Sequence, residues 1–475
     1  MFDQTPFVGK PNLQLRKATA AILTAAVRAV EPAAAVRRAL VRRGDRLRLD
    51  TQWYDLRQSR RIFVVGAGKA AAPMAAAAEQ VLGRRVTDGL VIVKYGHAGP
   101  LSRIRLVEAG HPLPDAAGER GAAQILDLLR SASGDDLVVF LVSGGGSALL
   151  PAPAPGLSLQ EKIAVTDLLL RSGATIQEIN IVRKHLSQVK GGRLAQVAAP
   201  ARLLVLVLSD VLGDPLDAIA SGPASPDPTT FADALAVVRR YQLEDRLPAS
   251  ALAYLRRGAS GQVAETPKPG DPLFHRVQVV VVGNNTHALA AAAQRAKGLG
   301  FHVLVLTPFL EGEAREAARV FASVARSIRA VRIPLIPPAC VLAGGETTVT
   351  VRGPGRGGRC QEFALAAAPA IAGRPEMIMA AFGTDGTDGP TDAAGALVDG
   401  ESAARATSIG LDLARALADN DSHAAFRDLG DLLVTGPTKT NVNDIYLALV
   451  GQMPPVREAT RVSRRIKHAA RVARG

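Results

Sequence analysis

The sequence is poor in cysteine and in aromatic residues. Its 475 residues include two cysteines, Cys340 and Cys360, and no Cys-x-x-Cys pair. Two cysteines cannot form a four-cysteine metal site or a disulfide framework, and such sparse use fits a reducing compartment, so we expect a cytoplasmic protein. Aromatic residues make up 4% of the chain, which leaves little surface for stacking on nucleic-acid bases.

Long apolar runs are also lacking, since no stretch has the roughly 20 apolar residues that span a membrane. Residues 18–27 follow two basic residues and partly resemble a signal peptide. However, Arg28 and the pair Arg37-Arg38 continue the same segment without a clear cleavage context, which favours an amphipathic helix. We therefore expect no membrane partner.

Known nucleotide-binding signatures are absent too. The sequence contains neither a Walker A motif nor the protein-kinase catalytic set, which excludes a P-loop kinase and a protein kinase. An EF-hand is excluded because the required later Glu is missing after the Asp-rich stretch 385–389.

The formal net charge of +14 is concentrated in two segments. Residues 28–61 hold ten Arg and four acidic residues, and residues 457–474 hold seven basic residues and one Glu. Because the rest of the chain is nearly neutral, we interpret the excess as solvated helix faces and expect no nucleic-acid partner. A mild attraction for anionic metabolites is compatible with it.

The first half alternates short apolar runs with helical patterns. Continuous apolar runs predict strands buried on both faces, as in a parallel sheet covered by helices. The strands are expected at 62–65, 89–93, 137–142 and 203–208. Helices are expected at 12–43, 70–82, 117–131, 158–171 and 229–242. This order predicts a Rossmann-like, doubly wound α/β domain.

The chain length predicts two domains. The stretch 258–275, rich in Gly, Pro and polar residues, is expected to link an N-terminal domain over 12–257 to a smaller C-terminal α/β domain over 276–452. A basic tail over 453–475 follows. Strands of the second domain are expected at 278–282, 302–306, 341–343 with 347–351, 377–382 and 445–450.

Two glycine-rich loops follow predicted strands of the first half, where open α/β sheets bind ligands. Glycines let backbone N–H groups approach an anion, and a lysine in the first loop adds a positive charge. That loop half matches a dinucleotide fingerprint, but the next predicted strand ends in Lys94 and not in an acidic residue. The candidate phosphate-binding residues are Gly66, Gly68, Lys69, Ser143, Gly144, Gly145, Gly146 and Ser147.

Acidic residues follow two further strands. Asp210 comes after the strand at 203–208, and Asp385 and Asp388 come after the strand at 377–382. Phosphoryl transfer needs Mg²⁺ held by one or two carboxylates and a group that orients the attacking hydroxyl, so these acids are candidates for both roles.

A third Gly pair, at 344–345, is followed by Glu346 and then by Arg359. The guanidinium of Arg359 is suited to bind a carboxylate or a phosphate with two hydrogen bonds. Glu346 is a candidate for the same site, although a simple pairing with an arginine is an equal alternative.

The histidines His97, His111 and His185 stand alone and are expected to be packed or surface residues. Basic residues at 183–185 and Lys190 form either an anion site or a basic helical face, and the sequence leaves both open.

Taken in order, these segments resemble the glycerate 2-kinase family, whose C-terminal half is called the MOFRL domain. The resemblance covers roughly residues 12–450. The stretches that carry it are VGAGKAA (65–71), LVSGGGSALL (141–150), RKHLSQVKGGRLA (183–195), LSDVLGDPLDAIASGPASPDPTT (208–230), AGGETTV (343–349), GGRCQEFALAAA (357–368), FGTDGTDGPTDAAGA (382–396) and TGPTKTNVNDI (435–445).

The resemblance implies ATP- and Mg²⁺-dependent phosphorylation of D-glycerate at its 2-hydroxyl group. It also implies an active site in the cleft between a large Rossmann-like domain and the MOFRL domain. We expect Lys69 and Arg359 to neutralise the carboxylate and phosphoryl charges. The residues expected to act as base, to hold the metal or to complete the binding site are Asp210, Asp385, Asp388, Lys190 and Glu346.

The chain departs from the family pattern at three positions: Cys360 stands where Asn is usual, Lys439 where Gly is usual, and Ala224 where Thr is usual. Two alternative functions stay open. One is an NAD(P)H-dependent hydroxypyruvate reductase, a label carried by some similar sequences, and the other is a non-catalytic nucleotide- or anion-binding module. A homodimer is also left open.

Overall fold

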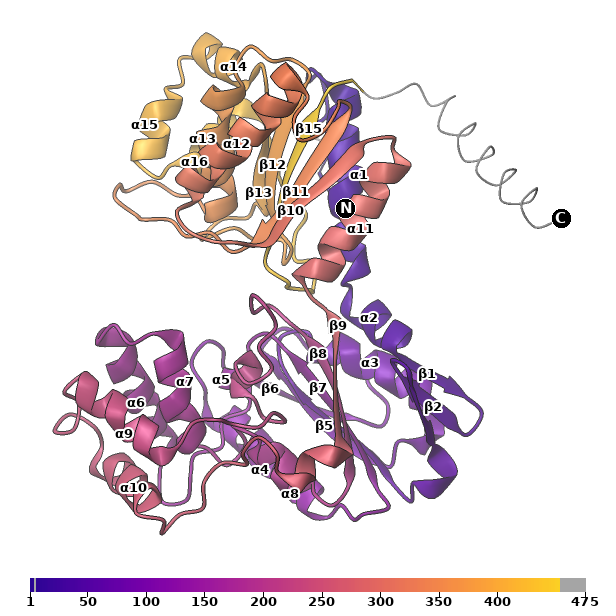
Figure 1. Cartoon of the computed structure of the whole chain (residues 1–475), viewed down its shortest axis with the longest axis vertical. Coiled ribbons are helices and arrows are strands. Elements are labelled where there is room, and N and C mark those ends of the chain that lie inside the picture. The colour runs from indigo at the N-terminus through magenta and orange to yellow at the C-terminus, as the bar shows by residue number, and fades with distance from the viewer. Residues whose placement is uncertain (4–5, 453–475) are drawn as a thin grey trace. The chain divides into compact units, whose positions relative to one another are not determined.

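The computed structural model describes residues 1–3 and 6–452, and the chain divides into two compact units (Figure 1). Residues 31–284 form the first, the parallel-sheet unit. Residues 1–30 and the chain from 285 onward form the second, the mixed-sheet unit. The basic tail expected at 453–475 lies outside the described residues.

The parallel-sheet unit is built on six parallel strands in the order β6-β5-β4-β7-β8-β9. The chain winds outward first on one side of β4 and then on the other, so β4 and β7 flank the point where the strand order reverses. The strands are β4 (Ile62–Ala67), β5 (Asp88–Lys94), β6 (Arg105–Ala109), β7 (Leu137–Ser143), β8 (Arg202–Leu208) and β9 (Val277–Gly283). The four strands expected from the first half are confirmed, and β6 is additional.

Helices cover both faces of this sheet, which confirms the doubly wound α/β fold. Helices α2 (Pro32–Ala39) and α3 (Ala71–Leu82) contact one face. Helices α4 (Ala116–Arg130) and α8 (Arg193–Ala198) share an apolar core with the other. A short helix, α5 (Gly146–Leu149), follows β7.

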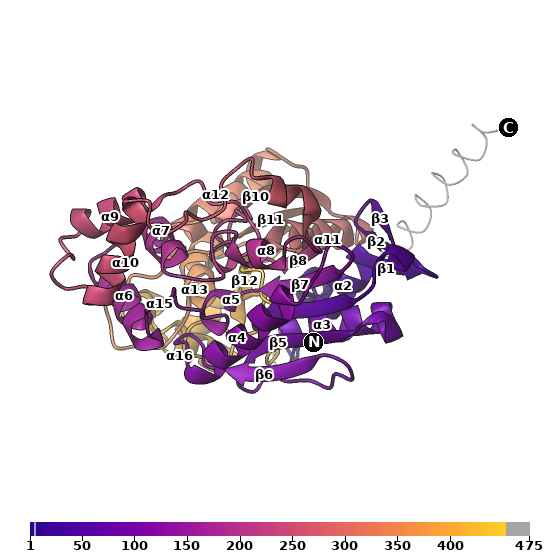
Figure 2. The ribbon, with the colours of Figure 1, turned by 90° about the horizontal axis from the view of Figure 1, so that it is seen from below.

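Four helices of the same unit gather into a cluster of their own around the buried ring of Phe231 (Figure 2). They are α6 (Leu159–Arg171), α7 (Ile176–His185), α9 (Phe231–Arg240) and α10 (Ala249–Ala259). Single turns of 3₁₀ helix occur at Leu56–Gln58, Gly83–Arg85, Ile219–Ser221 and Pro272–Arg276.

The long helix expected at 12–43 is wrong, because the chain there forms α1 (Leu13–Ala29), α2 and a strand. Pro32 disfavours a helical conformation at the preceding residue, and the Glu31 carboxylate accepts two N–H groups from the first turn of α2. Three antiparallel strands follow: β1 (Leu40–Arg43), β2 (Arg46–Leu49) and β3 (Gln52–Asp55).

The division into units also differs from the boundaries expected from the sequence. Residues 258–275 belong to the parallel-sheet unit, where the buried Thr266 hydroxyl donates to Asp227 at 3.0 Å. The strand expected at 278–282 is β9, and it pairs with β8 in the first sheet. The chain passes between units at 30/31 and at 284/285.

The mixed-sheet unit has six strands in the order β10-β11-β15-β12-β13-β14, of which β10 and β11 are parallel. Strand β15 runs antiparallel to both β11 and β12. The strands are β10 (His302–Leu310), β11 (Ala339–Gly345), β12 (Met377–Gly383), β13 (Gly395–Asp399), β14 (Leu432–Leu433) and β15 (Asp444–Val450).

The strand expected at 347–351 is wrong, since the chain there makes one isolated bridge, from Thr348 to Glu313. Its backbone bonds partly to side chains and partly to the main chain of residues 312–314, without forming a ladder. The N–H of Thr347 donates to the Tyr446 hydroxyl, and the N–H of Thr350 donates to the Glu313 carboxylate.

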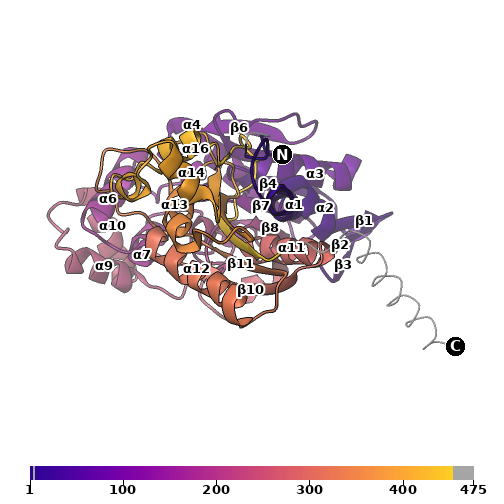
Figure 3. The same ribbon diagram turned by 90° about the horizontal axis from the view of Figure 1, so that it is seen from above.

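Helices cover both faces of the mixed sheet (Figure 3). On one face α1 packs along α11 (Asn285–Gly298), and on the other lie α12 (Ala314–Val331) and α13 (Arg359–Ile371). The remaining helices are α14 (Ser402–Ser408), α15 (Leu413–Ala418) and α16 (Ser422–Leu429), and all three contact α13.

A buried charge network fixes α1 in the mixed-sheet unit. Arg16 is fully buried and binds both Asp399 and Asp431. Arg405 binds the same two carboxylates at 2.8 Å each, so all four charges are paired. Removing one partner of such a network leaves a buried charge uncompensated, which explains why the first helix belongs with a sheet far along the chain.

Among the described residues, no single helix is long and apolar enough to cross a membrane. Helices α1 and α2 reach that length and composition only as a pair, with a bend of 56° between them.

Candidate functional site

The predicted site residues fall into two groups, one on each unit. In the parallel-sheet unit the two glycine-rich loops follow β4 and β7, the strands that flank the reversal of strand order. The N–H of Lys69 donates to the Gly144 carbonyl at 2.9 Å, and the N–H of Ala70 donates to the Ser143 hydroxyl at 3.0 Å. The two loops predicted to bind phosphate therefore lie against each other.

Missing side chains allow this close approach. A Cβ on Gly68, whose φ is +145°, would overlap the Ser143 hydroxyl. A Cβ on Gly144 would overlap the Oδ2 of Asp210. The Asp210 carboxylate, which follows β8, therefore lies directly against the second glycine-rich loop.

Lys69 carries the positive charge of this site. Its side chain is half-buried and passes close to Gly145. A Cβ added to Gly145 would lie 3.3 Å from the Lys69 Cγ. Within residues 1–3 and 6–452, its ammonium forms no ion pair with a carboxylate. The charge is thus available to an anionic ligand at the strand ends.

His111 is a member of this site that the sequence analysis missed. Its ring would lie 2.9 Å from a Cβ on Gly145. Burial, together with the nearby charges of Lys69, Lys94 and His97, lowers the pKa of His111 to about 4, so the imidazole is neutral at neutral pH. The sequence offered no reason to place His111 at the site, because it follows β6, a strand that the apolar pattern did not predict.

Further cations lie at the end of the second loop. The hydroxyl of Ser147 accepts from Arg183 at 2.5 Å and from Lys190 at 2.7 Å, and it lies 3.1 Å from the Ser221 hydroxyl. The sequence left open whether residues 183–185 form an anion site or a helical face. In the structure Arg183 lies with Lys190 at Ser147.

The mixed-sheet unit gathers the second group of predicted residues at one edge of its sheet. Gly345 at the end of β11 and Gly383 at the end of β12 both pair in register with Asp444 at the start of β15. The loops after β11 and β12 therefore meet the turn before β15.

Arg359, at the start of α13, is held by two carboxylates at this edge. Its Nε and one terminal nitrogen donate to Asp444 at 2.5 and 3.1 Å, and its other terminal nitrogen lies 2.9 Å from Glu346. Asn443 also donates to Glu346, at 2.9 Å. Burial raises the pKa of Asp444 to about 6, against the opposing effect of Arg359, and the carboxylates of Asp388 and Glu346 raise it too.

The two acids of the loop 383–389 differ in their surroundings. Both oxygens of the buried Asp388 accept N–H groups of Cys360 and Gln361 at 3.0 and 2.8 Å, so this carboxylate caps the first turn of α13. Asp385 is half-buried and uses one oxygen to accept from Thr387, whereas its other oxygen has no partner among the described residues. Asp385 is the better placed to accept a proton.

A metal ion requires carboxylate oxygens that are not already engaged. Among the residues that the structure describes, no group of three or more His, Cys, Asp or Glu side chains is arranged to hold a metal. Mg²⁺ in kinases is bound by one or two carboxylates together with phosphate oxygens, so a single well-placed acid suffices. Asp210 lies against the glycine loops, where phosphate is expected, and Asp388, with both oxygens bonded to N–H groups, fits the requirement poorly.

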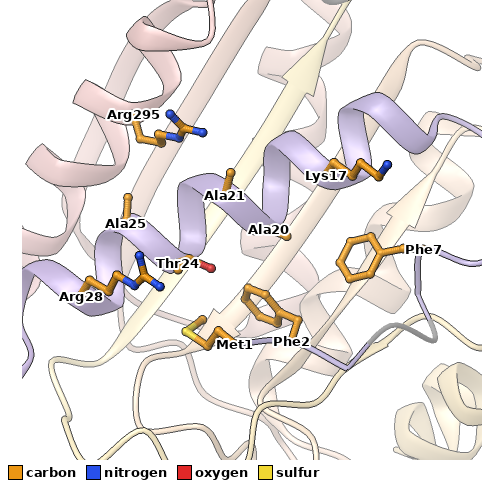
Figure 4. Close-up of a pocket in the computed structure, with 10 residues that line it drawn as sticks. All are labelled: Met1, Phe2, Phe7, Lys17, Ala20, Ala21, Thr24, Ala25, Arg28 and Arg295. Atoms are coloured by element: carbon orange, nitrogen blue, oxygen red, sulfur yellow. The ribbon is translucent and has the colours of Figure 1, made fainter.

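A separate cavity of about 550 Å³ opens on the mixed-sheet unit between the N-terminal residues, α1 and α11 (Figure 4). It combines three basic side chains with apolar ones, and it contains none of the predicted site residues. The lining residues are Met1, Phe2, Phe7, Lys17, Ala20, Ala21, Thr24, Ala25, Arg28 and Arg295.

Comparison with known proteins identifies relatives over nearly the whole chain. A model described as a domain of unknown function (DUF4147) matches residues 18–256, and the MOFRL family model matches residues 339–444. The D-glycerate 2-kinase of Thermotoga maritima is 44% identical over 437 residues, which cover 92% of this chain and 98% of that protein. An Agrobacterium vitis protein with the provisional name hydroxypyruvate reductase is 47% identical over 393 residues, 82% of this chain and 87% of that one.

The crystal structure of a glycerate kinase from Thermotoga maritima has the same fold. It matches with a TM-score of 0.83 at 42% identity, and the match covers 92% of this chain and 99% of that one.

Proposed function

The chain belongs to the glycerate kinase family, and we propose that it transfers the γ-phosphoryl group of ATP to the 2-hydroxyl group of D-glycerate, giving ADP and 2-phosphoglycerate. The observation that carries this proposal is the pair of glycine-rich loops at the reversal of strand order, with Lys69 in the first loop forming no ion pair among the described residues. Backbone N–H groups and a fixed positive charge at that position suit a phosphate chain.

Phosphoryl transfer is catalysed mainly by positioning and by electrostatic stabilisation of the transferred group. In this proposal the loops at Gly66–Lys69 and Ser143–Ser147 hold phosphate oxygens, and Lys69 stabilises the charge that develops on them. Bound Mg²⁺ would neutralise phosphate charge, and Asp210 is the residue placed to hold it.

The acceptor hydroxyl has to lose a proton. Asp385 keeps one carboxylate oxygen without a partner among the described residues and lies after the carboxyl end of β12, so we assign it the role of accepting or orienting this proton. Arg359 is engaged by Asp444 and Glu346, and we assign it to holding that edge of the mixed sheet in shape for an anionic ligand.

The direct test is a coupled assay for ADP release with ATP, Mg²⁺ and each of D-glycerate, tartrate and hydroxypyruvate. Activity with D-glycerate, and ³¹P NMR identification of 2-phosphoglycerate as the product, is the expected result. Formation of 3-phosphoglycerate would correct the position of transfer, and ADP release with tartrate alone would replace the substrate.

Hydroxypyruvate reduction is the second candidate, because the Agrobacterium vitis relative bears that name and the strand order is that of dinucleotide-binding sheets. Against it, β5, the strand beside β4, ends in Lys94 where the ribose-binding acid of such sheets is expected. Oxidation of NADH or NADPH by hydroxypyruvate, without any use of ATP, would establish the reductase in place of the kinase.

The activity is expected to fall as the pH drops below about 6, because the pKa of Asp444 is raised to about 6 by burial. Above this pH the carboxylate is charged and holds Arg359; below it the protonated acid releases the guanidinium. Because one protonation is responsible, kcat/KM should fall about tenfold for each pH unit below this pKa. A pH–rate profile measures this. The Asp444→Asn variant should be less active overall and should lack this acid limb. An unchanged limb in the variant would assign it to another group.

A further inference from the structure

Two cations of the parallel-sheet unit, Arg183 and Lys190, bind Ser147, and a third, Lys162, is near enough to interact electrostatically with them. None of the three has a carboxylate partner among the described residues. Lys190 donates to the main-chain oxygen and to the hydroxyl of Ser147, at 3.0 and 2.7 Å, and to the Ala220 carbonyl at 3.3 Å. Arg183 donates to the same hydroxyl. The ammonium of Lys162, a residue that is 7% exposed, has no hydrogen-bond partner. We call Lys162, Arg183 and Lys190 the Ser147 cation cluster.

The same unit shows how a structural cation is buried. Lys184 follows Arg183 on α7 and is 3% exposed, and its ammonium lies 3.1 Å from Asp217 and 3.4 Å from Asp227. Burial of a charge is costly unless it is paired, and two carboxylates meet that cost here. No ion pair is formed by the Ser147 cation cluster within the described part of the chain. Its countercharge is therefore expected to come from a ligand.

The cluster members also act on one another. Burial, together with the charge of Arg183 and against the opposing effect of Glu119, lowers the pKa of Lys162 to about 7. Burial, with the charges of Arg183 and Lys162, holds the pKa of Lys190 well below its usual range. An anion placed among these groups would reverse both effects, so its binding would draw protons onto the two lysines.

The position of the cluster gives a ligand access. Lys162 lies on the buried side of α6 with Leu159 and Val165, so its side chain emerges from an apolar face. Ser147 and Arg183 are half-buried, and Ser147 lies in the first turn of α5, directly after the loop that follows β7. A group bound among the loop N–H groups can therefore extend to the cluster.

We propose that the Ser147 cation cluster is a subsite for a phosphoryl group, with Lys162 and Arg183 binding it together with Lys190 and the Ser147 hydroxyl. The inference rests on the proposed function, which supplies two molecules of this chemistry, the nucleotide phosphates and the phosphorylated product. A phosphoryl group carries up to two negative charges and three acceptor oxygens, and it matches several cations better than the single charge of a carboxylate does.

The test is the Lys162→Met variant, which keeps a long apolar side chain and removes the ammonium. Calorimetric titrations would use inorganic tripolyphosphate, ADP, 2-phosphoglycerate and D-glycerate as probes. We expect at least one phosphorylated probe to bind about tenfold or more weakly than to the wild type, the scale of a charge-assisted hydrogen bond. The Tm of the free variant should be unchanged or higher, since an unpartnered buried charge has been removed.

Two control variants separate the subsite from other effects. Lys297→Met removes the same charge from an exposed position on α11 and should leave every affinity unchanged. Lys184→Met removes an equally buried but paired ammonium, so it should lower the Tm by leaving Asp217 and Asp227 without their partner.

The probes distinguish the source of the phosphoryl group. Weaker binding of tripolyphosphate and ADP places a nucleotide phosphate in the subsite, and weaker binding of 2-phosphoglycerate alone places the product there; either supports the inference. Unchanged affinity for all four probes, or a loss confined to D-glycerate, would overturn it. If the wild type phosphorylates D-glycerate and Lys162→Met binds all probes normally, the subsite is refuted and the proposed function stands. If Lys162→Met weakens binding of a phosphorylated probe but the wild type does not phosphorylate D-glycerate, the subsite stands and the proposed function is refuted.

Discussion

Alanine in place of Lys69 is expected to lower kcat/KM for D-glycerate phosphorylation by about 10²-fold or more, the scale of losing one electrostatic contact in the transition state. The structure supports a large effect because the half-buried Lys69 has no carboxylate partner in the described chain, and its side chain passes close to Gly145. No described residue forms an ion pair with it, so its charge is available to the transferred group.

The loss should appear in kcat more than in KM, because the charge on the phosphoryl oxygens develops during transfer. The Lys69 backbone N–H, which donates to Gly144, is kept in the variant, so the loop should hold its shape and the Tm should change little. Partial rescue by small alkylamines would show that the missing ammonium is responsible. Lys297→Ala, an exposed site on the other unit, serves as the charge control. A near-wild-type rate for Lys69→Ala would remove Lys69 from the site.

The glycine loops could be found from the sequence because each directly follows a continuous apolar strand. Burial of β4 and β7 on both faces leaves a pattern that needs no knowledge of the partner strands. What the pattern does not contain is the order of the strands, because that depends on pairing between distant segments. The contact of Gly144 with Asp210 follows from this order, and only the structure reveals it.

The two acids after β12 illustrate a different limit. Both occur in the same turn, and composition alone makes them equivalent metal ligands. Their roles separate through partners elsewhere in the chain: α13 offers two N–H groups to Asp388, whereas the Asp385 carboxylate bonds, among the described residues, within its own turn. Helix termini bind carboxylates for structural reasons as readily as they bind ligands, so an acid after a strand is no guide to a free oxygen.

Lys162 shows that a usable signal was present and was overlooked. With Leu159 and Val165 it follows helical spacing, so the pattern places a lysine on the apolar face of α6. A charged residue on such a face is rarely buried without a partner, and its presence marks a position for closer study. His111 offers no comparable signal, because it follows the partly exposed strand β6 and stands alone in a loop.

Alanine at Gly144 is expected to lower kcat by about 10³-fold, at the upper end of the loss seen when one preorganised donor is removed. The added Cβ would overlap the Oδ2 of Asp210 and lie 3.1 Å from its Oδ1, so either the carboxylate or the loop has to move. A shift of the carboxylate displaces the candidate metal ligand, and a shift of the loop redirects its N–H groups. Gly134→Ala, where the nearest atom is 4.0 Å from the new Cβ, is the matched control and should be silent.

A double-mutant cycle decides which movement occurs. If the overlap with Asp210 is the cause, then in the Asp210→Ala background the clash is absent and Gly144→Ala should add little further loss of kcat. Fully additive losses would mean that the loop, and not the carboxylate, yields to the new Cβ. Wild-type kcat for Gly144→Ala alone would contradict the close packing of the two loops at the reversal of strand order, and with it the assignment of phosphate to this site.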